Sequence, residues 1–206
     1  MALKDEIFYL DYKVWYALNV EWHNSFLDAV VPFLRNQWTW VPLYLFLLLF
    51  MTGSFKRKGW MWCVFFILTF ALSDHISAAM LKPVFQRLRP CNNPYLATII
   101  HNIVPCGGGY SFPSSHAANH FSLGVFSAIT LQRVVKRVWI MALTWAFLVG
   151  YAQVYVGVHY PLDVLGGGLL GTVIGCITGF VFNRVYRLDV YLRPATKDSS
   201  SFTEAS

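Results

Sequence analysis

Residues 43–50 read Leu-Tyr-Leu-Phe-Leu-Leu-Leu-Phe and form the centre of an uncharged stretch that extends from residue 36 to residue 55. A helix needs about 20 mostly apolar residues to cross the hydrocarbon core of a bilayer, which is about 30 Å thick. Four further stretches approach or exceed this length: residues 59–81, interrupted only by Asp74 and His75, residues 112–132, which begin with polar residues and two histidines, and residues 138–158 and 164–183. The sequence therefore predicts an all-α fold, a polytopic membrane helix bundle with about five transmembrane helices.

The composition supports this prediction. Of the 206 residues, 56% are hydrophobic, 17% are aromatic and 13% are charged, whereas roughly a quarter of an average globular chain is charged. A soluble fold of this length could not bury so much apolar surface. A cytosolic enzyme, a disordered tail protein and a secreted disulfide-rich mini-protein are thereby excluded.

The N-terminal segment differs from the predicted spans. Residues 6–33 are apolar and aromatic but carry Asp11, Lys13, Glu21, His23 and Asp28. This pattern favours an interfacial helix or pair of helices over a sixth span. We therefore expect three parts: an interfacial segment over residues 1–35, a transmembrane domain over residues 36–188, and a polar cytoplasmic tail over residues 189–206.

Ten of the sixteen lysines and arginines lie at residues 56–58, at residues 133–137 and after residue 183. Five spans place these three regions on one side of the membrane, which the positive-inside rule assigns to the cytoplasm. Topology explains the net charge of +6, so nucleic acid is not an expected partner. The external side then receives residues 82–112 and 156–163.

Two of the four cysteines, Cys91 and Cys106, lie in the long external segment, and Cys63 and Cys176 lie inside spans. An oxidising compartment favours a disulfide between the external pair. Such a disulfide closes a loop of about fifteen residues and contributes about 3 kcal/mol to stability in the loop-entropy model. A zinc site is the alternative, although no Cys-x-x-Cys spacing supports it.

Three external segments carry candidate site residues. In the first, Lys82 ends a span and Arg89 follows seven residues later. Two cations at a membrane rim suit an anionic headgroup, which arginine can bind bidentately. Ordinary snorkelling of both side chains toward lipid phosphates is the alternative.

In the second segment, a glycine run leads to Pro113-Ser114-Ser115-His116 at the start of the third span. The N–H groups at a helix N-terminus form an anion site. Ser114 as a helix cap and nothing more is the alternative. His116 and His120 share a helix face, and ionisable groups inside a membrane indicate function.

In the third segment, Asp163 follows His159 by four residues and can accept its ring N–H, which fixes the tautomer. Glycines then repeat every fourth residue on the face of Asp163, at Gly167, Gly171, Gly175 and Gly179. Such a small-residue ridge packs closely against another helix. The ridge should direct Asp163 into the bundle.

Lys82 with Arg89-Pro90, then Pro113-Ser114-Ser115-His116, then His159 with Asp163 resembles the three-part signature of the type 2 phosphatidic acid phosphatase superfamily. The order, the internal spacing and the shared membrane face all match, over roughly residues 35–185. The resemblance implies that His159 attacks phosphorus, oriented by Asp163, and that His116 protonates the leaving group. It implies phosphate binding, without a metal, by Lys82, Arg89, Ser114 and the backbone N–H groups around Ser115.

Two positions depart from the family pattern. Ser115 stands where glycine is usual. This change is minor, because serine has the same backbone N–H donor as glycine. The third motif usually begins Ser-Arg, six residues before its histidine, where this chain has Ala152 and Gln153. Gln153 can donate a hydrogen bond to phosphate but brings no charge, so one of three expected cations is missing. Arg87 is a candidate substitute that nothing in the sequence positions.

The expected function is a metal-independent lipid phosphate or diphosphate phosphatase in a bacterial cytoplasmic membrane, with its active site facing the periplasm or exterior. Undecaprenyl diphosphate is the preferred substrate, because small bacterial members resembling this chain commonly recycle that carrier. Lipid A phosphates, phosphatidylglycerol phosphate and phosphatidic acid remain open, as does phosphotransfer to another hydroxyl. The partners expected are membrane lipids and the lipid substrate, and the oligomeric state is not predicted.

Two alternatives come from other functional classes. His116, His120, His159 and Asp163 could form a metal-ligand set, although Lys82 and Arg89 would repel a cation. The absence of a charge at Gln153 favours a second alternative, a lipid-binding or lipid-translocating protein with an impaired site.

Overall fold

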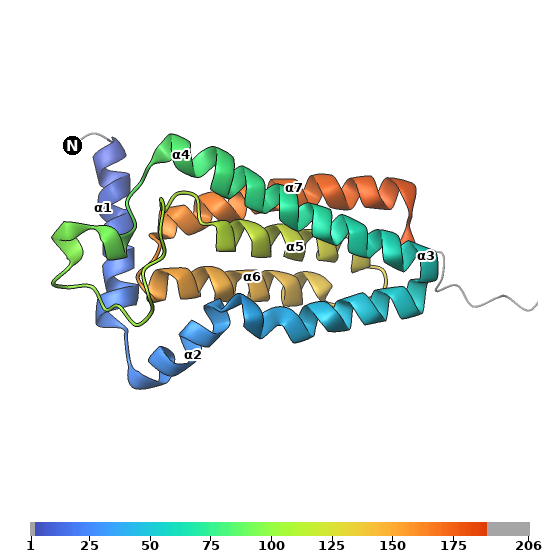
Figure 1. Cartoon of the computed structure of the whole chain (residues 1–206), viewed down its shortest axis with the longest axis horizontal. Coiled ribbons are helices and arrows are strands. Elements are labelled where there is room, and N and C mark those ends of the chain that lie inside the picture. Colours follow the sequence, from blue (N-terminus) through green and yellow to red (C-terminus); the bar gives the residue numbers. More distant parts are fainter. Residues whose placement is uncertain (1–2, 189–206) are drawn as a thin grey trace, which may run out of the picture.

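The computed structural model describes residues 3–188, which form a helical bundle without a strand in that range (Figure 1). The predicted all-α fold is thus confirmed, and the predicted tail over residues 189–206 lies outside the described part. The α-helices are α1 (Leu3–Tyr16), α2 (Ser25–Arg35), α3 (Val41–Asp74), α4 (Lys82–Phe85), α5 (Ser115–Leu131), α6 (Val138–Tyr155) and α7 (Pro161–Val185). Two π-helical segments, Ala17–Glu21 and His75–Leu81, extend α1 and α3.

Helix α3 consists of two arms that double back on each other (Figure 1). The reversal lies at Lys56, whose φ of 48° and ψ of −124° are not helical. Gly59 allows the arms to meet, because a Cβ atom there would lie 1.8 Å from the carbonyl oxygen of Met51. The two arms correspond to the predicted spans at residues 36–55 and 59–81, and the turn carries the basic residues 56–58.

Three helical stretches are long and apolar enough to cross a membrane, namely Gln37–Phe85, Val138–Tyr155 and Pro161–Val185. The first of these contains both arms of α3. Helix α5 has 17 residues, fewer than the roughly 20 of a typical span, and contacts α3, α6 and α7. The third predicted span is therefore the enclosed central helix of a multi-pass bundle.

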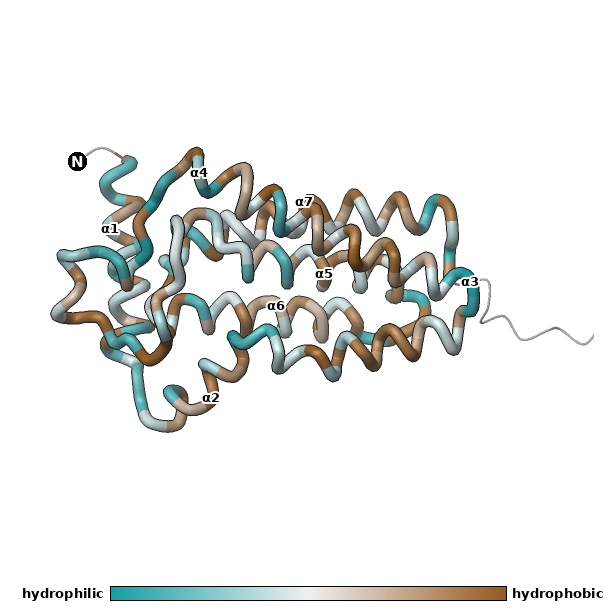
Figure 2. The backbone as a smooth tube through the Cα atoms, in the orientation of Figure 1, coloured by the Kyte–Doolittle hydropathy of each residue, from teal (hydrophilic) through white to brown (hydrophobic). Residues whose placement is uncertain are grey.

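The glycine ridge of α7 packs against α5, as predicted. A Cβ atom at Gly171 would lie 2.2 Å from the carbonyl oxygen of Ala118, so only glycine permits this approach. On other faces of α7, large apolar residues are exposed, including Leu165, Leu169, Val173 and Ile177. Figure 2 shows long hydrophobic segments along α3 and α7. The ridge directs Asp163 into the bundle, where it is fully buried.

The N-terminal segment forms two short helices at one end of the bundle, and neither is long enough to span a membrane. Helix α1 crosses this end, and α2 leads back to α3 (Figure 1). Trp15 of α1 is buried against Tyr160. The Nδ2 atom of Asn19 donates to the carbonyl oxygen of Tyr155 at 2.6 Å. This segment therefore covers the end of the bundle that carries the predicted site.

Candidate active site

The three predicted motifs converge at the end of the bundle crossed by α1 (Figure 1). Lys82 is the first residue of α4, Arg89 comes from the long connecting segment, and Gln153 comes from the last turn of α6. The remaining residues come from the start of α5 and from the turn into α7: Ser114, Ser115, His116, His159 and Asp163.

His159 lies between an arginine and a carboxylate. Its Nε2 atom is 3.1 Å from Nη1 of Arg89, and its Nδ1 atom is 3.4 Å from Oδ2 of Asp163. A guanidinium group only donates hydrogen bonds, so Nε2 must accept and the ring proton lies on Nδ1. Burial lowers the pKa of His159 to about 4, against the opposing effect of Asp163. The imidazole is therefore neutral at physiological pH, with its lone pair on Nε2.

Asp163 is held in place from two sides. Oδ2 accepts the backbone N–H of Tyr160 at 2.8 Å, and Oδ1 accepts Nη1 of Arg87 at 2.7 Å. The other terminal nitrogen of Arg87 donates to Asp11 of α1, whose second oxygen accepts the N–H of Leu162 at 2.7 Å. Arg87 is thus bound to two carboxylates and does not substitute for the missing phosphate cation. Asp11 is a supporting residue that the motifs gave no means of finding.

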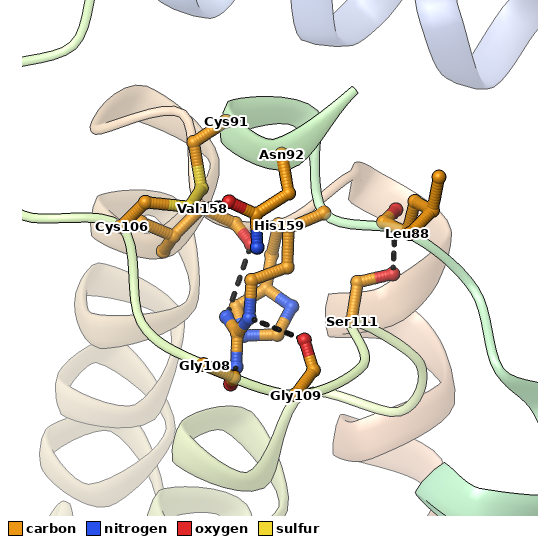
Figure 3. The surroundings of a disulfide bond; sticks show 10 residues. Leu88, Cys91, Asn92, Cys106, Gly108, Gly109, Ser111, Val158 and His159 are labelled. Atoms are coloured by element: carbon orange, nitrogen blue, oxygen red, sulfur yellow. Dashed lines mark hydrogen bonds between the residues drawn. A yellow bond between two sulfur atoms is a disulfide. The ribbon is translucent and has the colours of Figure 1, made fainter. Parts of the chain in front are cut away.

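Arg89 is 8% exposed and is bound by backbone carbonyls of the glycine run. Its Nε and Nη2 atoms donate to the carbonyl oxygens of Gly109 and Gly108 at 3.3 and 3.4 Å. The predicted disulfide between Cys91 and Cys106 is present, with 5.8 Å between their Cα atoms. Figure 3 shows this bond beside His159, with the glycine run passing nearby. The disulfide thus joins the two parts of the connecting segment that surround Arg89.

The two serines make local contacts. The Ser114 hydroxyl accepts the N–H of Ala117 at 3.4 Å, which is the cap of α5. Ser115 accepts a hydrogen bond from the Ser77 hydroxyl at 3.0 Å. Lys82 interacts electrostatically with Arg89 and Asp163, and among residues 3–188 no group accepts a hydrogen bond from its ammonium. The cap is therefore present, and the Lys82 donors remain available to a ligand.

His116 lines a cavity of about 340 Å³ that also touches Ser115 and Asp74 and then Tyr44, Phe70 and Leu123. A second cavity of about 350 Å³ has almost entirely apolar walls. It shares Tyr44, Phe70 and Leu123 with the first cavity. It extends between the arms of α3 toward Trp62 and Cys63. An apolar groove therefore leads from His116 toward the middle of the bundle.

Gln153 is fully buried and contacts an arginine that the sequence analysis missed. Its Oε1 atom accepts Nε of Arg35 at 3.2 Å, and its Nε2 atom has no hydrogen-bond partner. Arg35 ends α2 and interacts electrostatically with Arg89 and His116. The missing motif arginine was a signal that another cation was needed, but 118 residues separate Arg35 from Gln153.

The metal-ligand alternative does not match the geometry. Within residues 3–188, the one group of three or more potential ligands with donor atoms within 4.8 Å of one another is His23, Asp28 and His101. His116, His120, His159 and Asp163 do not form such a group. The Nδ1 atom of His120 donates a hydrogen bond to the carbonyl oxygen of His116 at 2.8 Å and is therefore not available to a metal.

Comparisons with known proteins agree with the motifs. The PAP2 superfamily model matches residues 60–187. The chain is 32% identical over 167 residues to the lipid A 4'-phosphatase of Bacteroides thetaiotaomicron, covering 79% of this chain and 73% of that protein. It is 26% identical over 186 residues to the undecaprenyl-diphosphatase BcrC of Bacillus subtilis, covering 90% and 87%.

The fold is also shared with a solved structure. The crystal structure of the transmembrane PAP2 type phosphatidylglycerolphosphate phosphatase from Bacillus subtilis superposes with a TM-score of 0.71 at 24% identity, covering 89% of each chain. The predicted resemblance is confirmed: this chain belongs to the PAP2 superfamily and is a multi-pass membrane lipid phosphatase.

Proposed function

We propose that the protein hydrolyses a lipid phosphate or diphosphate at the extracytoplasmic face of a bacterial cytoplasmic membrane, through a phosphohistidine at His159. The observation that carries this proposal is the arrangement of His159 between Arg89 and Asp163. It presents a neutral Nε2 lone pair beside a phosphate-binding guanidinium. The basic turns at residues 56–58 and 133–137 lie at the other end of the bundle (Figure 1), which supports the proposed orientation.

In the first step, Nε2 of His159 attacks the phosphorus of a monophosphate, or the terminal phosphorus of a diphosphate, and the bond from that phosphorus to the leaving-group oxygen breaks. Asp163 stabilises the positive charge that develops on the ring, and Arg87 keeps Asp163 oriented. His116, in its protonated form, donates a proton to the departing oxygen and becomes neutral. The neutral His116 then takes a proton from water, which attacks phosphorus, breaks the P–N bond and releases phosphate.

Charge on the transferred phosphoryl group is stabilised by Arg89, by Lys82 and by the N–H groups at the start of α5. Arg89 donates to Nε2 in this structure, so binding of phosphate requires that it turn toward a phosphate oxygen. Because these cations neutralise the phosphate oxygens, we propose that the reaction proceeds without a metal ion.

For the substrate, we propose a single-chain carrier lipid such as undecaprenyl diphosphate. The apolar groove that begins at His116 and continues between the arms of α3 offers space for one hydrocarbon chain. A relative named undecaprenyl-diphosphatase matches 90% of this chain. Both observations support a prenyl diphosphate.

A lipid A phosphate is the second candidate. It is favoured by the higher identity, 32%, to a relative named lipid A 4'-phosphatase. The two substrates differ in the number of hydrocarbon chains and in whether the leaving group is a phosphate or a sugar hydroxyl. A direct comparison of rates therefore separates them.

The test is phosphate release by detergent-purified protein from undecaprenyl diphosphate, lipid A, phosphatidylglycerol phosphate and phosphatidic acid, with a chelator present. We expect release to be fastest from undecaprenyl diphosphate and to disappear in His159→Ala. His75→Ala is the matched control, because it removes an exposed histidine from the π-helical segment that follows α3. Faster release from lipid A would overturn the proposed substrate, and dependence on a metal would overturn the proposed mechanism.

A further inference from the structure

Arg35 and Gln153 form a hydrogen-bonded pair close enough to the predicted phosphate site for Arg35 to act on Arg89 and His116. Nε of Arg35 donates to Oε1 of Gln153 at 3.2 Å, and the structure gives Arg35 no other hydrogen bond within residues 3–188. The Nε2 atom of Gln153 is buried without a partner. Buried donors are almost always satisfied by protein, by water or by a ligand. The amide nitrogen of Gln153 therefore marks a place for an acceptor that the described residues do not supply, beside the half-buried guanidinium of Arg35.

The charges around the pair indicate an anionic acceptor. The positive charge of Arg35 acts on Arg89 and on His116, and Lys82 also acts on His116. The nearby carboxylate of Asp163 is already bound by Arg87. The other carboxylate that acts on Lys82, Asp74, accepts a hydrogen bond from Nδ2 of Asn119 and forms no ion pair within the described residues. Arg35, Arg89 and Lys82 are partly buried, and their mutual repulsion is costly. A bound phosphate removes this cost.

Glutamine at position 153 suits an arginine that arrives from α2. Its amide oxygen accepts a hydrogen bond from Nε of Arg35, which an arginine at the same position could not do because a guanidinium only donates. The contact leaves both terminal nitrogens of Arg35 available for bidentate binding of phosphate. The amide nitrogen of Gln153 remains as an additional donor.

Helix α2 is fixed relative to α6, so the position of Arg35 is defined. Asp28 of α2 accepts the hydroxyl of Tyr155 at 2.7 Å and Nε2 of His101 at 3.1 Å. Tyr155 lies two residues after Gln153. The same end of α6 therefore contacts α2 twice, through Tyr155 with Asp28 and through Gln153 with Arg35. The N-terminal segment thereby contributes to the site.

We propose that Arg35 is the third phosphate-binding cation of this enzyme, supplied by α2 in place of the motif arginine, and that Gln153 positions it. This inference rests on the proposed function, because its ligand is the phosphoryl group that His159 attacks. Gln153 has then not impaired the site: the cation has moved to another helix, and glutamine accommodates it.

The test is an exchange of the two side chains. We expect Arg35→Gln to lower kcat/KM about tenfold to a hundredfold, mainly through KM, because one charged phosphate contact is lost. Gln153→Arg should also lower kcat/KM, because two guanidinium groups then repel each other. The double variant Arg35→Gln with Gln153→Arg should recover most of the activity, since it returns one cation and one amide to the site. Arg184→Gln, at the exposed other end of α7, is the control.

A binding measurement separates this inference from the proposed function. Inorganic phosphate should raise the Tm of the wild type and of Arg184→Gln, and should raise that of Arg35→Gln markedly less. Because this measurement needs no turnover, it remains informative if no lipid is hydrolysed. The Tm values without phosphate show whether each variant folds.

Two results would overturn the role of Arg35. One is an unchanged KM together with an unchanged response to phosphate in a folded Arg35→Gln protein. The other is a gain of activity in Gln153→Arg alone, which would mean that the site lacks a cation even though Arg35 is present.

Discussion

The Nη1 atom of Arg89 lies 3.1 Å from the Nε2 atom of His159. The residue that we assign to phosphate binding therefore also donates to the lone pair of the proposed nucleophile. We propose that phosphate oxygens compete for the same guanidinium, so that substrate binding frees Nε2 of His159 for attack. In this proposal, Arg89 couples recognition of the headgroup to activation of the nucleophile.

Arg89→Lys tests this coupling. Lysine keeps the charge but cannot donate simultaneously to Val158, to the glycine carbonyls and to the phosphate. We expect kcat/KM to fall about a hundredfold, which corresponds to about 2.7 kcal/mol. Steady-state phosphate release measures the effect, and Arg57→Lys on the opposite turn is the control. Retention of wild-type kcat/KM would show that charge alone suffices at this position.

The ion pairs of Arg87 with Asp11 and Asp163 should be strongly coupled. Arg87→Gln leaves two carboxylates with fully buried side chains unpaired, whereas Arg87 itself keeps 20% of its side chain exposed. We expect a loss of about 3 kcal/mol, the lower end of the range for breaking a buried pair, because Arg87 is partly exposed. Adding Asp11→Asn should cost little more, because its partner is already gone. Reversible unfolding in mixed micelles gives the free energies, and strictly additive losses would contradict the coupling.

The pKa of His159 predicts a dependence of stability on pH. Burial lowers this pKa to about 4, below the value of about 6.5 in an unfolded chain. The unfolded state therefore binds the proton more readily, and the stability that His159 contributes is present above pH 6.5 and is lost as the pH falls toward 4. The Tm of His159→Asn should thus fall less than that of the wild type over this range. Parallel Tm curves would show that burial does not perturb His159.

The close contact between α5 and α7 can be tested with one methyl group. Gly171→Ala places a Cβ atom 2.2 Å from the carbonyl oxygen of Ala118, and overpacking of this kind costs about 1–3 kcal/mol. Gly53→Ala meets nothing within 4 Å in the first arm of α3. That control should gain stability, by roughly 0.5–1 kcal/mol, because alanine favours helix. A Gly171→Ala protein as stable as the wild type would contradict the packing.

The sequence was most informative where residues close in the chain also act together. Asp163 lies four residues after His159, and the glycines after Asp163 repeat every fourth residue along α7, so the face that Asp163 shares with the glycines followed from helix geometry. The disulfide followed from two cysteines in one external segment. The motif residues could be placed at one membrane face because the spans between them are long and uncharged.

The remaining features depend on contacts between distant segments. Arg35 meets Gln153 across 118 residues, and Asp11 meets Arg87 across 76. A single arginine or aspartate in an amphipathic segment is usually solvated, so neither carried a local signal. The sequence also did not show that α5 is the enclosed central helix, because the uncharged stretch at residues 112–132 is as long as an ordinary span, whereas α5 itself has 17 residues.

The central claim is that His159 carries the phosphoryl group. The most direct measurement uses a prenyl diphosphate labelled in its terminal phosphate, mixed with the enzyme and quenched in alkali within the first turnover. Our account predicts base-stable, acid-labile label on the peptide that contains His159, and no label in His159→Ala. Phosphate release without labelled protein, or label that is found on Ser114 or persists in His159→Ala, would contradict it.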